Sequence, residues 1–429
     1  MKATSCLFSI LCCSSMLSAT SARAESVDFG AVNLASHTTA TVTMNLATTV
    51  RVARIAVRTN GRENADFLSA GKGTCRLNKL YSGNGTCTVV VRFTPHFAGL
   101  RSGAVVLADK SGAVLATTYI HGIGVGVQSG VAHDAKEVID GLRQPNGVAV
   151  DQSGNLYVIT NSGDGSMHSS TVVREMPLPS GSYAPVHAIS GTYPQRVVAV
   201  DGSGNIFVAG AGMYIYKETP KLHGTYAESS LGGSMGSQCG LALDGAGNVY
   251  TSDCNHNKLY KEILSTNGSY TQLEINTTMK GPAGLAVDGD GVIYVAALED
   301  KKVYKETPSG DGYTESTLDV TFDAPQGLAL DGAGNVYVSD FSTGEVYEET
   351  PTPNGYVQST VASDVGANYV AVDGAGTLYV SDLGQGRVIR LSHVKTDPAA
   401  PPRTTVPELP SKPASNPASM PDATERNPQ

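Results

Sequence analysis

The sequence predicts an all-β protein in which a β-sandwich is followed by a β-propeller of six blades. The chain has 48 Gly and 19 Tyr, no Trp and only 16% charged residues. This composition favours short strands and tight turns over long amphipathic helices. Short runs with period-2 alternation fill the first 125 residues, and a phrase with one aspartate recurs about every 43 residues in the remainder.

The first residues predict an export signal over residues 1–24. Lys2 gives a positive start, the stretch from Cys6 to Leu17 is apolar, and Ala22-Arg23-Ala24 has the small-x-small pattern of a cleavage site. A membrane anchor is the alternative, but three serines interrupt the apolar run and roughly 20 apolar residues are needed to span a bilayer. We therefore expect a mature chain that begins at Glu25, is secreted or periplasmic, and has no transmembrane segment.

Four cysteines remain after the signal: Cys75, Cys87, Cys239 and Cys254. In an oxidising compartment an even number of cysteines favours disulfides, and the members of each neighbouring pair are close in sequence. The expected bridges are Cys75 with Cys87 and Cys239 with Cys254. Zinc is the alternative, but the spacings lack a C-x-x-C pair, so no metal and no cofactor are predicted.

Residues 25–125 predict an antiparallel β-sandwich of the immunoglobulin-like kind, because several short alternating runs are separated by Gly, Asn and Ser turns. The expected strands are 40–46, Val52–Val57, Cys87–Phe93, Gly103–Leu107 and Ala116–Ile120.

Three motifs of this segment occur in a known family. Val27-Asp28-Phe29-Gly30 opens it, Phe93-Thr94-Pro95 is followed by Gly99-x-Arg101-Ser102, and His121-Gly-Ile-Gly-Val125 closes it. With these residues the segment resembles the immunoglobulin-like domains called ASH or choice-of-anchor D. The resemblance implies a role as an adaptor or spacer. The segment 47–50 departs from the family, which usually has an Asn-x-Gly turn there.

Residues 136–393 are built from repeats, and residues 126–135 are expected to be a linker. The repeated phrase has two aliphatic residues, an aspartate and a glycine turn, with the aspartates at positions 151, 201, 244, 288, 331 and 373. A period near 43 with four strand-like runs is the signature of a propeller blade. In the fifth unit these runs are Gly327–Asp331, Asn335–Asp340, Glu345–Thr350 and Tyr356–Val361.

Recurring motifs identify the kind of repeat. Pro-x-Gly precedes the first strand, Asp-Gly-x-Gly follows it, and Tyr-Val-Ser-Asp ends the second strand at Asp340 and Asp382. With these motifs the units resemble NHL repeats, which implies a six-bladed propeller. The acid that ends the second strand is also present as Asp253, and other residues replace it in three units: Thr160, Gly210 and Ala297.

The sixth unit lacks its fourth strand, and a strand from before the first unit is expected to supply it. Lys136–Ile139 is a short strand-like run without a unit of its own, so we expect it to pair beside Arg387–Leu391 and close the ring. The tail, residues 394–429, is rich in Pro, Ser, Ala and Thr and is expected to be disordered.

The candidate site is the mouth of the axial channel, because the first strand of each blade lines that channel. One residue per blade is expected at the rim: Asn146, Arg196, Cys239, Ala283, Gln326 and Asn368. The predicted ligand-binding residues are Asn146, Arg196, Gln326 and Asn368, together with His168 from a loop insertion at 161–170. Amides and one guanidinium can bind a polar or anionic group but supply no general base or nucleophile, so no catalytic residue is predicted.

The sequence favours a binding role over catalysis. The formal charge of −9 repels phosphate backbones and excludes nucleic acid as a partner. We expect a monomer that binds an extracytoplasmic protein, peptide or polymer. The alternative is a lyase or hydrolase with an axial divalent metal, because some six-bladed propellers with similar repeats are such enzymes.

Overall fold

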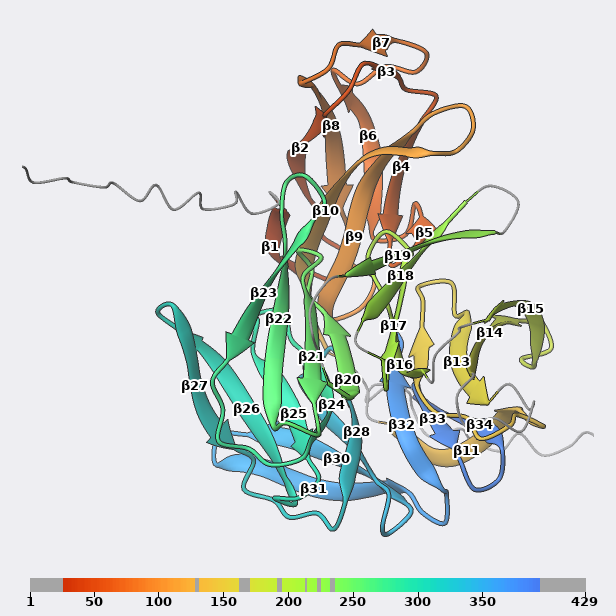
Figure 1. Cartoon of the computed structure of the whole chain (residues 1–429), viewed down its shortest axis with the longest axis vertical. Helices are drawn as coiled ribbons and strands as arrows, with labels where there is room; N and C mark the ends of the chain where they lie inside the picture. Colours follow the sequence, from red (N-terminus) through yellow and green to blue (C-terminus); the bar gives the residue numbers. More distant parts are fainter. Residues whose placement is uncertain are drawn as a thin grey trace, which may run out of the picture. The chain divides into compact units, whose positions relative to one another are not determined.

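The computed structural model describes residues 26–127, 131–161, 170–190, 195–212, 214–221, 225–231 and 236–393. The expected signal peptide, the tail from residue 394 and His168 lie outside these residues. The described residues form strands and turns without a helix, which confirms the all-β prediction (Figure 1). The described segments therefore contain no helix that could cross a membrane.

Residues Ser26 to Val127 form two sheets that pack face to face, and this pair is the N-terminal sandwich. One sheet has the order β1-β10-β9-β4-β5, the other has the order β2-β8-β6, and β3 pairs with β7. The strands are β1 (Val27–Asn33), β2 (Thr38–Leu46), β3 (Val50–Arg51), β4 (Arg54–Thr59), β5 (Arg62–Glu63), β6 (Phe67–Gly73), β7 (Leu80–Tyr81), β8 (Gly85–Phe93), β9 (Gly99–Ala108) and β10 (Val114–Val125).

The sandwich core is centred on three aromatic rings. Phe29, Phe67 and Phe93 are buried, and the ring centroids of Phe67 and Phe93 lie 4.6 Å apart in a stacked arrangement. The predicted disulfide between Cys75 and Cys87 is present beside them. The alternating apolar residues of the two sheets thus share one core, as the period-2 pattern predicts.

The rest of the described chain forms six four-stranded antiparallel sheets, named first to sixth. The first five are β12 (Val148–Val150), β13 (Leu156–Asn161), β14 (Ser170–Pro177), β15 (Tyr183–Ser190); β16 (Gln195–Val200), β17 (Ile206–Gly210), β18 (Ile215–Pro220), β19 (Tyr226–Leu231); β20 (Gln238–Leu243), β21 (Val249–Asp253), β22 (Lys258–Leu264), β23 (Tyr270–Ile275); β24 (Pro282–Val287), β25 (Ile293–Ala297), β26 (Lys302–Ser309), β27 (Gly312–Thr317); β28 (Pro325–Leu330), β29 (Val336–Asp340), β30 (Glu345–Thr352), β31 (Gly355–Ala362). The sixth is β32 (Ala367–Val372), β33 (Leu378–Asp382), β34 (Arg387–His393) and β11 (Val131–Ile139).

The first strands of these sheets form a closed ring. Each of β12, β16, β20, β24, β28 and β32 contacts the first strand of the next sheet, and β32 contacts β12. Four-stranded sheets around a central channel are the architecture of a β-propeller. The described ring is therefore a β-propeller.

Strand β11 closes the sixth sheet from the other end of the repeats. It pairs antiparallel with β34, with Lys136 opposite Arg390 and Ile139 opposite Val388, so the expected pairing is present. The strand begins at Val131, inside the segment 126–135 that was expected to be a linker.

The turn between the first and second strands has the same two backbone hydrogen bonds to its aspartate in every sheet. In the third sheet, Asp244 Oδ1 accepts hydrogen bonds from the backbone N–H groups of Ala246 and Asn248, while Oδ2 accepts from the side chains of Asn248 and Tyr250. The second glycine of each Asp-x-x-Gly turn has a positive φ between 78° and 88°, which requires glycine. These six turns mark one end of the ring, the turn end. The opposite end, where the first strands begin, is the rim end.

A glutamate is buried at one equivalent position of the third strand in five sheets. In cross-strand register, the fourth strand presents Gln to two of these glutamates and Glu to two others. Burial raises the pKa of three of them, Glu218, Glu306 and Glu349, to about 7. The five buried residues are Glu175, Glu218, Glu262, Glu306 and Glu349.

Candidate functional site

The rim residues come from the beginnings of the first strands, where the chain enters the ring. Asn146 precedes β12, and Arg196, Gln326 and Asn368 belong to the starts of β16, β28 and β32. Asn368 is buried with 1% of its surface exposed, Asn146 and Gln326 are half-buried, and Arg196 is exposed.

Three of the predicted residues are joined by side-chain hydrogen bonds. Gln326 Nε2 donates to Asn368 Oδ1, and Asn368 Nδ2 donates to Asn146 Oδ1 at 2.6 Å. This amide chain links the fifth, sixth and first sheets, which are neighbours in the ring. The structure therefore brings Asn146, Gln326 and Asn368 together as one polar group at the channel mouth.

The side chain of Arg196 contacts the rim of the third sheet. Its Nη1 atom is 3.6 Å from Sγ of Cys239, the rim residue of the third sheet. Cys239 forms the predicted disulfide with Cys254, at the end of the first hairpin of that sheet. The guanidinium group is thus held beside a covalent bridge, and its exposed position leaves it accessible to an anionic ligand.

Tyr369 crosses the channel and was not predicted. Its hydroxyl donates to the carbonyl oxygen of Cys239 at 3.0 Å, which joins the sixth sheet to the third. Burial raises the pKa of Tyr369 to about 12, although the positive charge of Arg196 lowers it, so the hydroxyl stays a donor at neutral pH. The side chain is 8% exposed.

The sequence did contain a signal for Tyr369. Four of the other five sheets have glycine at its position: Gly147, Gly240, Gly284 and Gly327. A Cβ at Gly147 would lie 2.6 Å from the carbonyl oxygen of Arg196, so glycine lets neighbouring first strands approach closely. Val197 and Tyr369 are the two exceptions in that pattern, and Tyr369 has the larger side chain.

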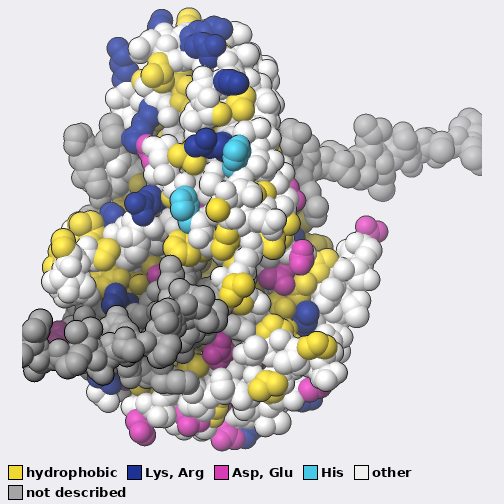
Figure 2. Space-filling view, turned by 180° about the vertical axis from the view of Figure 1, so that it is seen from behind, with side chains coloured by type: hydrophobic (Ala, Val, Ile, Leu, Met, Phe, Trp, Pro, Cys, Tyr) yellow, Lys and Arg dark blue, Asp and Glu magenta, His cyan; other side chains and the backbone are white. Residues whose placement is uncertain are grey.

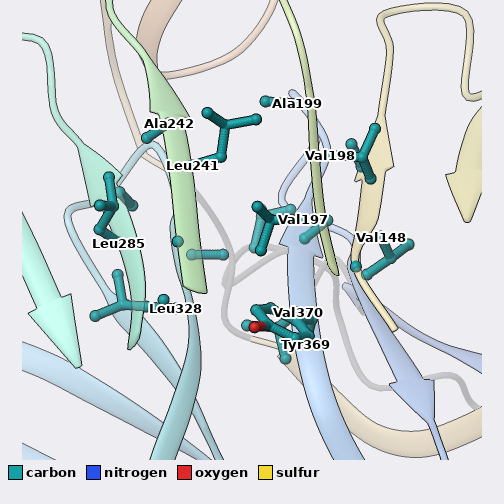
Figure 3. Close-up of a pocket in the computed structure, with 18 of the residues that line it drawn as sticks. Val148, Val197, Val198, Ala199, Leu241, Ala242, Leu285, Leu328, Tyr369 and Val370 are labelled. Carbon is teal, nitrogen blue, oxygen red and sulfur yellow. The ribbon is translucent and has the colours of Figure 1, made fainter. Parts of the chain in front are cut away.

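Below the rim, the channel is apolar. A cavity of about 240 Å³ is lined by aliphatic side chains of the first strands, with Tyr369 at one side (Figure 3). The side chains that Figure 3 labels include Val148, Val197, Leu241, Leu285, Leu328 and Val370. The candidate site thus combines a polar mouth with an apolar interior.

Other polar side chains near the rim have structural roles or lack a partner. Asp340 accepts hydrogen bonds from the backbone of Asp323, Ala324, Ser342 and Thr343, so the acid at the end of the second strand ties two loops together. Gln238, which precedes Cys239, is fully buried, and neither polar atom of its side chain has a hydrogen-bond partner among the described residues.

In the segments that the structure describes, no three His, Cys, Asp or Glu side chains are grouped so that they could hold a metal ion. No family model and no curated protein matches this chain.

Solved structures resemble part of the chain. A gluconolactonase from Xanthomonas campestris has a TM-score of 0.49 at 14% identity over 63% of this chain and 96% of its own. A streptogramin B lyase has a TM-score of 0.43 at 13% identity over 61% and 98%. A protein described as a putative gluconolactonase has a TM-score of 0.46 at 16% identity over 61% and 92%. Scores this low support no inference about activity.

Proposed function

We propose that the chain is an exported binding module: a six-bladed NHL-type propeller over residues 136–393 with an immunoglobulin-like adaptor over residues 25–125. The two disulfides fit a secreted or periplasmic protein, because such bridges persist in oxidising compartments. The proposed ligand is a protein, peptide or polymer of that compartment, and the module works as a monomer.

The observation that supports binding is the composition of the channel mouth. Asn146, Gln326 and Asn368 form one hydrogen-bonded amide group, which holds their side chains in fixed orientations. Pre-organised amides bind polar groups at a lower entropic cost than flexible ones. Tyr369 and the aliphatic channel wall below them supply an apolar surface for the remainder of a ligand.

The position of Arg196 leads us to propose a ligand that has a carboxylate. It is an exposed cation at the rim, and a guanidinium group forms charge-assisted hydrogen bonds with carboxylates. A ligand with a carboxylate, such as the free carboxyl terminus of a peptide, can contact Arg196 while its neighbouring groups contact the amide chain. Asp164, a rival partner for Arg196 in the sequence, lies outside the described residues.

A peptide library tests this function. The mature protein is screened against short peptides with free carboxyl termini and against the same peptides with amidated termini. We expect preference for the free carboxylate, and Arg196→Ala should remove that preference at a cost of about 1 kcal/mol, because an exposed charged bond is screened. Lys221→Ala, which removes an exposed cation from the same sheet, is the control. Equal binding of both peptide sets by the unmodified protein would contradict the assignment.

A further inference from the structure

The first glycine of the Asp-Gly-x-Gly turn has no backbone reason to be glycine. The second glycine of each turn needs its positive φ, whereas the first has an ordinary φ that any residue can adopt. Five of the six turns nevertheless have glycine there, and the first sheet has Gln152. The five are Gly202, Gly245, Gly289, Gly332 and Gly374.

Each of these glycines lies against the N-terminal sandwich. A Cβ at Gly202 would lie 2.6 Å from the backbone nitrogen of Gly103 in β9, and one at Gly245 would lie 2.4 Å from Cβ of His121 in β10. Those at Gly289 and Gly374 would meet the side chains of Ile123 and Arg101, and Gly332 is in contact with Gly99.

Gln152, which replaces this glycine in the first sheet, also contacts the sandwich. Arg101 Nη2 donates to Gln152 Oε1 at 2.6 Å, and the backbone N–H of Gln152 donates to the carbonyl oxygen of Asn60. Arg101 is held for this contact by a buried ion pair with Asp66, whose Oδ2 is 2.5 Å from Arg101 Nε. All six turns therefore contact the sandwich.

One turn is incomplete without the sandwich. In the second sheet, Phe207 occupies the position where four other sheets have a tyrosine whose hydroxyl donates to the turn aspartate. Tyr119 of β10 supplies the absent hydroxyl and donates to Asp201 Oδ2 at 2.6 Å. Both residues are buried. Burial, and then the charge of Asp201, raises the pKa of Tyr119 well above its usual range, so the hydroxyl remains a donor.

The charges of the two parts are complementary. Residues 26–127 contain 10 Lys and Arg against 4 Asp and Glu, whereas residues 131–393 contain 14 Lys and Arg against 30 Asp and Glu. Figure 2 shows Lys and Arg side chains gathered over the upper part of the view and Asp and Glu side chains over the lower part. Opposite net charges favour association of the sandwich with the ring.

We infer that the turn end of the ring is a docking surface for the chain's own N-terminal sandwich, and that the first glycine of five of the six turns leaves room for it. The docked sandwich covers the turn end of the axial channel. A second cavity of about 450 Å³ there is lined by Leu100, Arg101 and Ile123 of the sandwich, by aspartates and glycines of the turns, and by aliphatic residues that also line the end of the channel. Ligands therefore reach the channel from the rim end. This inference is independent of the proposed ligand.

The test uses the full mature protein and Gly202→Val. We expect the side chain to separate the sandwich from the ring, which increases the radius of gyration in small-angle scattering and speeds amide hydrogen exchange at 98–104 and 201–204. Gly312→Val is the matched control, because a Cβ at Gly312 meets nothing within 4 Å and its φ is ordinary. Unchanged scattering and exchange for Gly202→Val would overturn the inference, as would an equal effect of Gly312→Val.

A milder variant keeps the test decisive if Gly202→Val does not fold. Tyr119→Phe should speed exchange at 98–104 and 201–204 about tenfold, because it removes a hydrogen bond to a charged group. Adding Phe207→Tyr gives Asp201 a hydroxyl from its own sheet, as in four of the other turns. The double variant should recover slow exchange at 201–204 but not at 98–104. Unchanged exchange in Tyr119→Phe, or full recovery in both segments, would contradict docking through Tyr119.

Discussion

At the turn end of the ring the six sheets present almost the same residues, whereas at the rim end they present five different residue types. The uniform end contacts the sandwich through its glycines and backbone, and through the side chains of Gln152 and Asp201. The varied end holds the amide chain, Arg196 and Tyr369. The difference indicates that the repeated residues of the turn end form the surface that contacts the sandwich. The residues that differ from sheet to sheet form the candidate ligand site at the rim end.

The largest expected effect comes from the covalent bridge at the rim. Replacing Cys239 and Cys254 by serine opens a loop of 15 residues and should lower the free energy of unfolding by about 3 kcal/mol. Chemical denaturation with fluorescence detection measures it. Because the bridge is at the rim, exchange of the sandwich segment 98–104 should stay unchanged, and acceleration there would show that the two ends are coupled.

The next effect tests the turn end. Asp244→Ala removes the acceptor of four hydrogen bonds and leaves partly buried donors unpaired, so we expect a loss of about 2 kcal/mol in the free energy of unfolding. Peptide binding at the rim should keep its affinity when measured well below the melting temperature. A loss of binding by the folded variant would mean that the two ends do not have separate roles.

The buried glutamates predict how stability depends on pH. The pKa values of Glu218, Glu306 and Glu349 are raised to about 7 in the folded state from an ordinary value of 4.5, so the folded protein holds more protons than the unfolded chain between these values. The free energy of unfolding should therefore be highest below about 4.5 and fall as the pH rises through 7. Thermal melting between pH 4.5 and 8.5 measures it, and a stability that rises with pH over this range would be the contrary result.

Two sheets provide a matched pair for that effect. Glu218 faces Glu228 in the second sheet, whereas Glu262 accepts a hydrogen bond from Gln272 at the same place in the third. Glu228→Gln should raise the free energy of unfolding at pH 8 by about 1 kcal/mol, and the reverse change Gln272→Glu should lower it by a similar amount. Shifts in the same direction for both variants would exclude the carboxyl pair as the cause.

The smallest effect concerns the bond across the channel. Tyr369→Phe removes the hydrogen bond to the Cys239 carbonyl and should cost about 0.5 to 1 kcal/mol of stability, because the bond joins neutral groups. Ligand affinity at the rim should change by less than the effect of Arg196→Ala. A loss of several kcal/mol would show that Tyr369 holds the ring together.

Local patterns predicted most of the strands and both disulfides. The alternation and the glycine turns are short-range signals, and Cys239 and Cys254 flank a hairpin whose geometry the sequence specifies. The pairing of the strand around Lys136 with the strand around Arg390 could also be predicted, because the last unit lacks its fourth strand and needs one from elsewhere.

The remaining features depend on contacts between distant segments. Tyr369 and Cys239 are 130 residues apart, and Tyr119 and Asp201 are 82 apart, so no local pattern connects them. In the sequence the glycines of the turns suit a hairpin, and only the position of the sandwich shows why the first glycine is needed. The buried glutamates did leave a sequence signal, the Tyr-Lys-Glu runs that begin at Tyr216, Tyr260 and Tyr304.

The sandwich occupies the turn end of the ring, and we propose that the rim end is left for a ligand. Two backbone hydrogen bonds join the parts directly: Gly61 N–H donates to the Gly202 carbonyl, and Gln152 N–H donates to that of Asn60. Residue-resolved hydrogen exchange of these two amides in the unmodified mature protein is the most direct measurement. We expect both amides to be protected as strongly as amides inside β9. Exchange as fast as that of the Gly310 amide, in an outer turn, would contradict it.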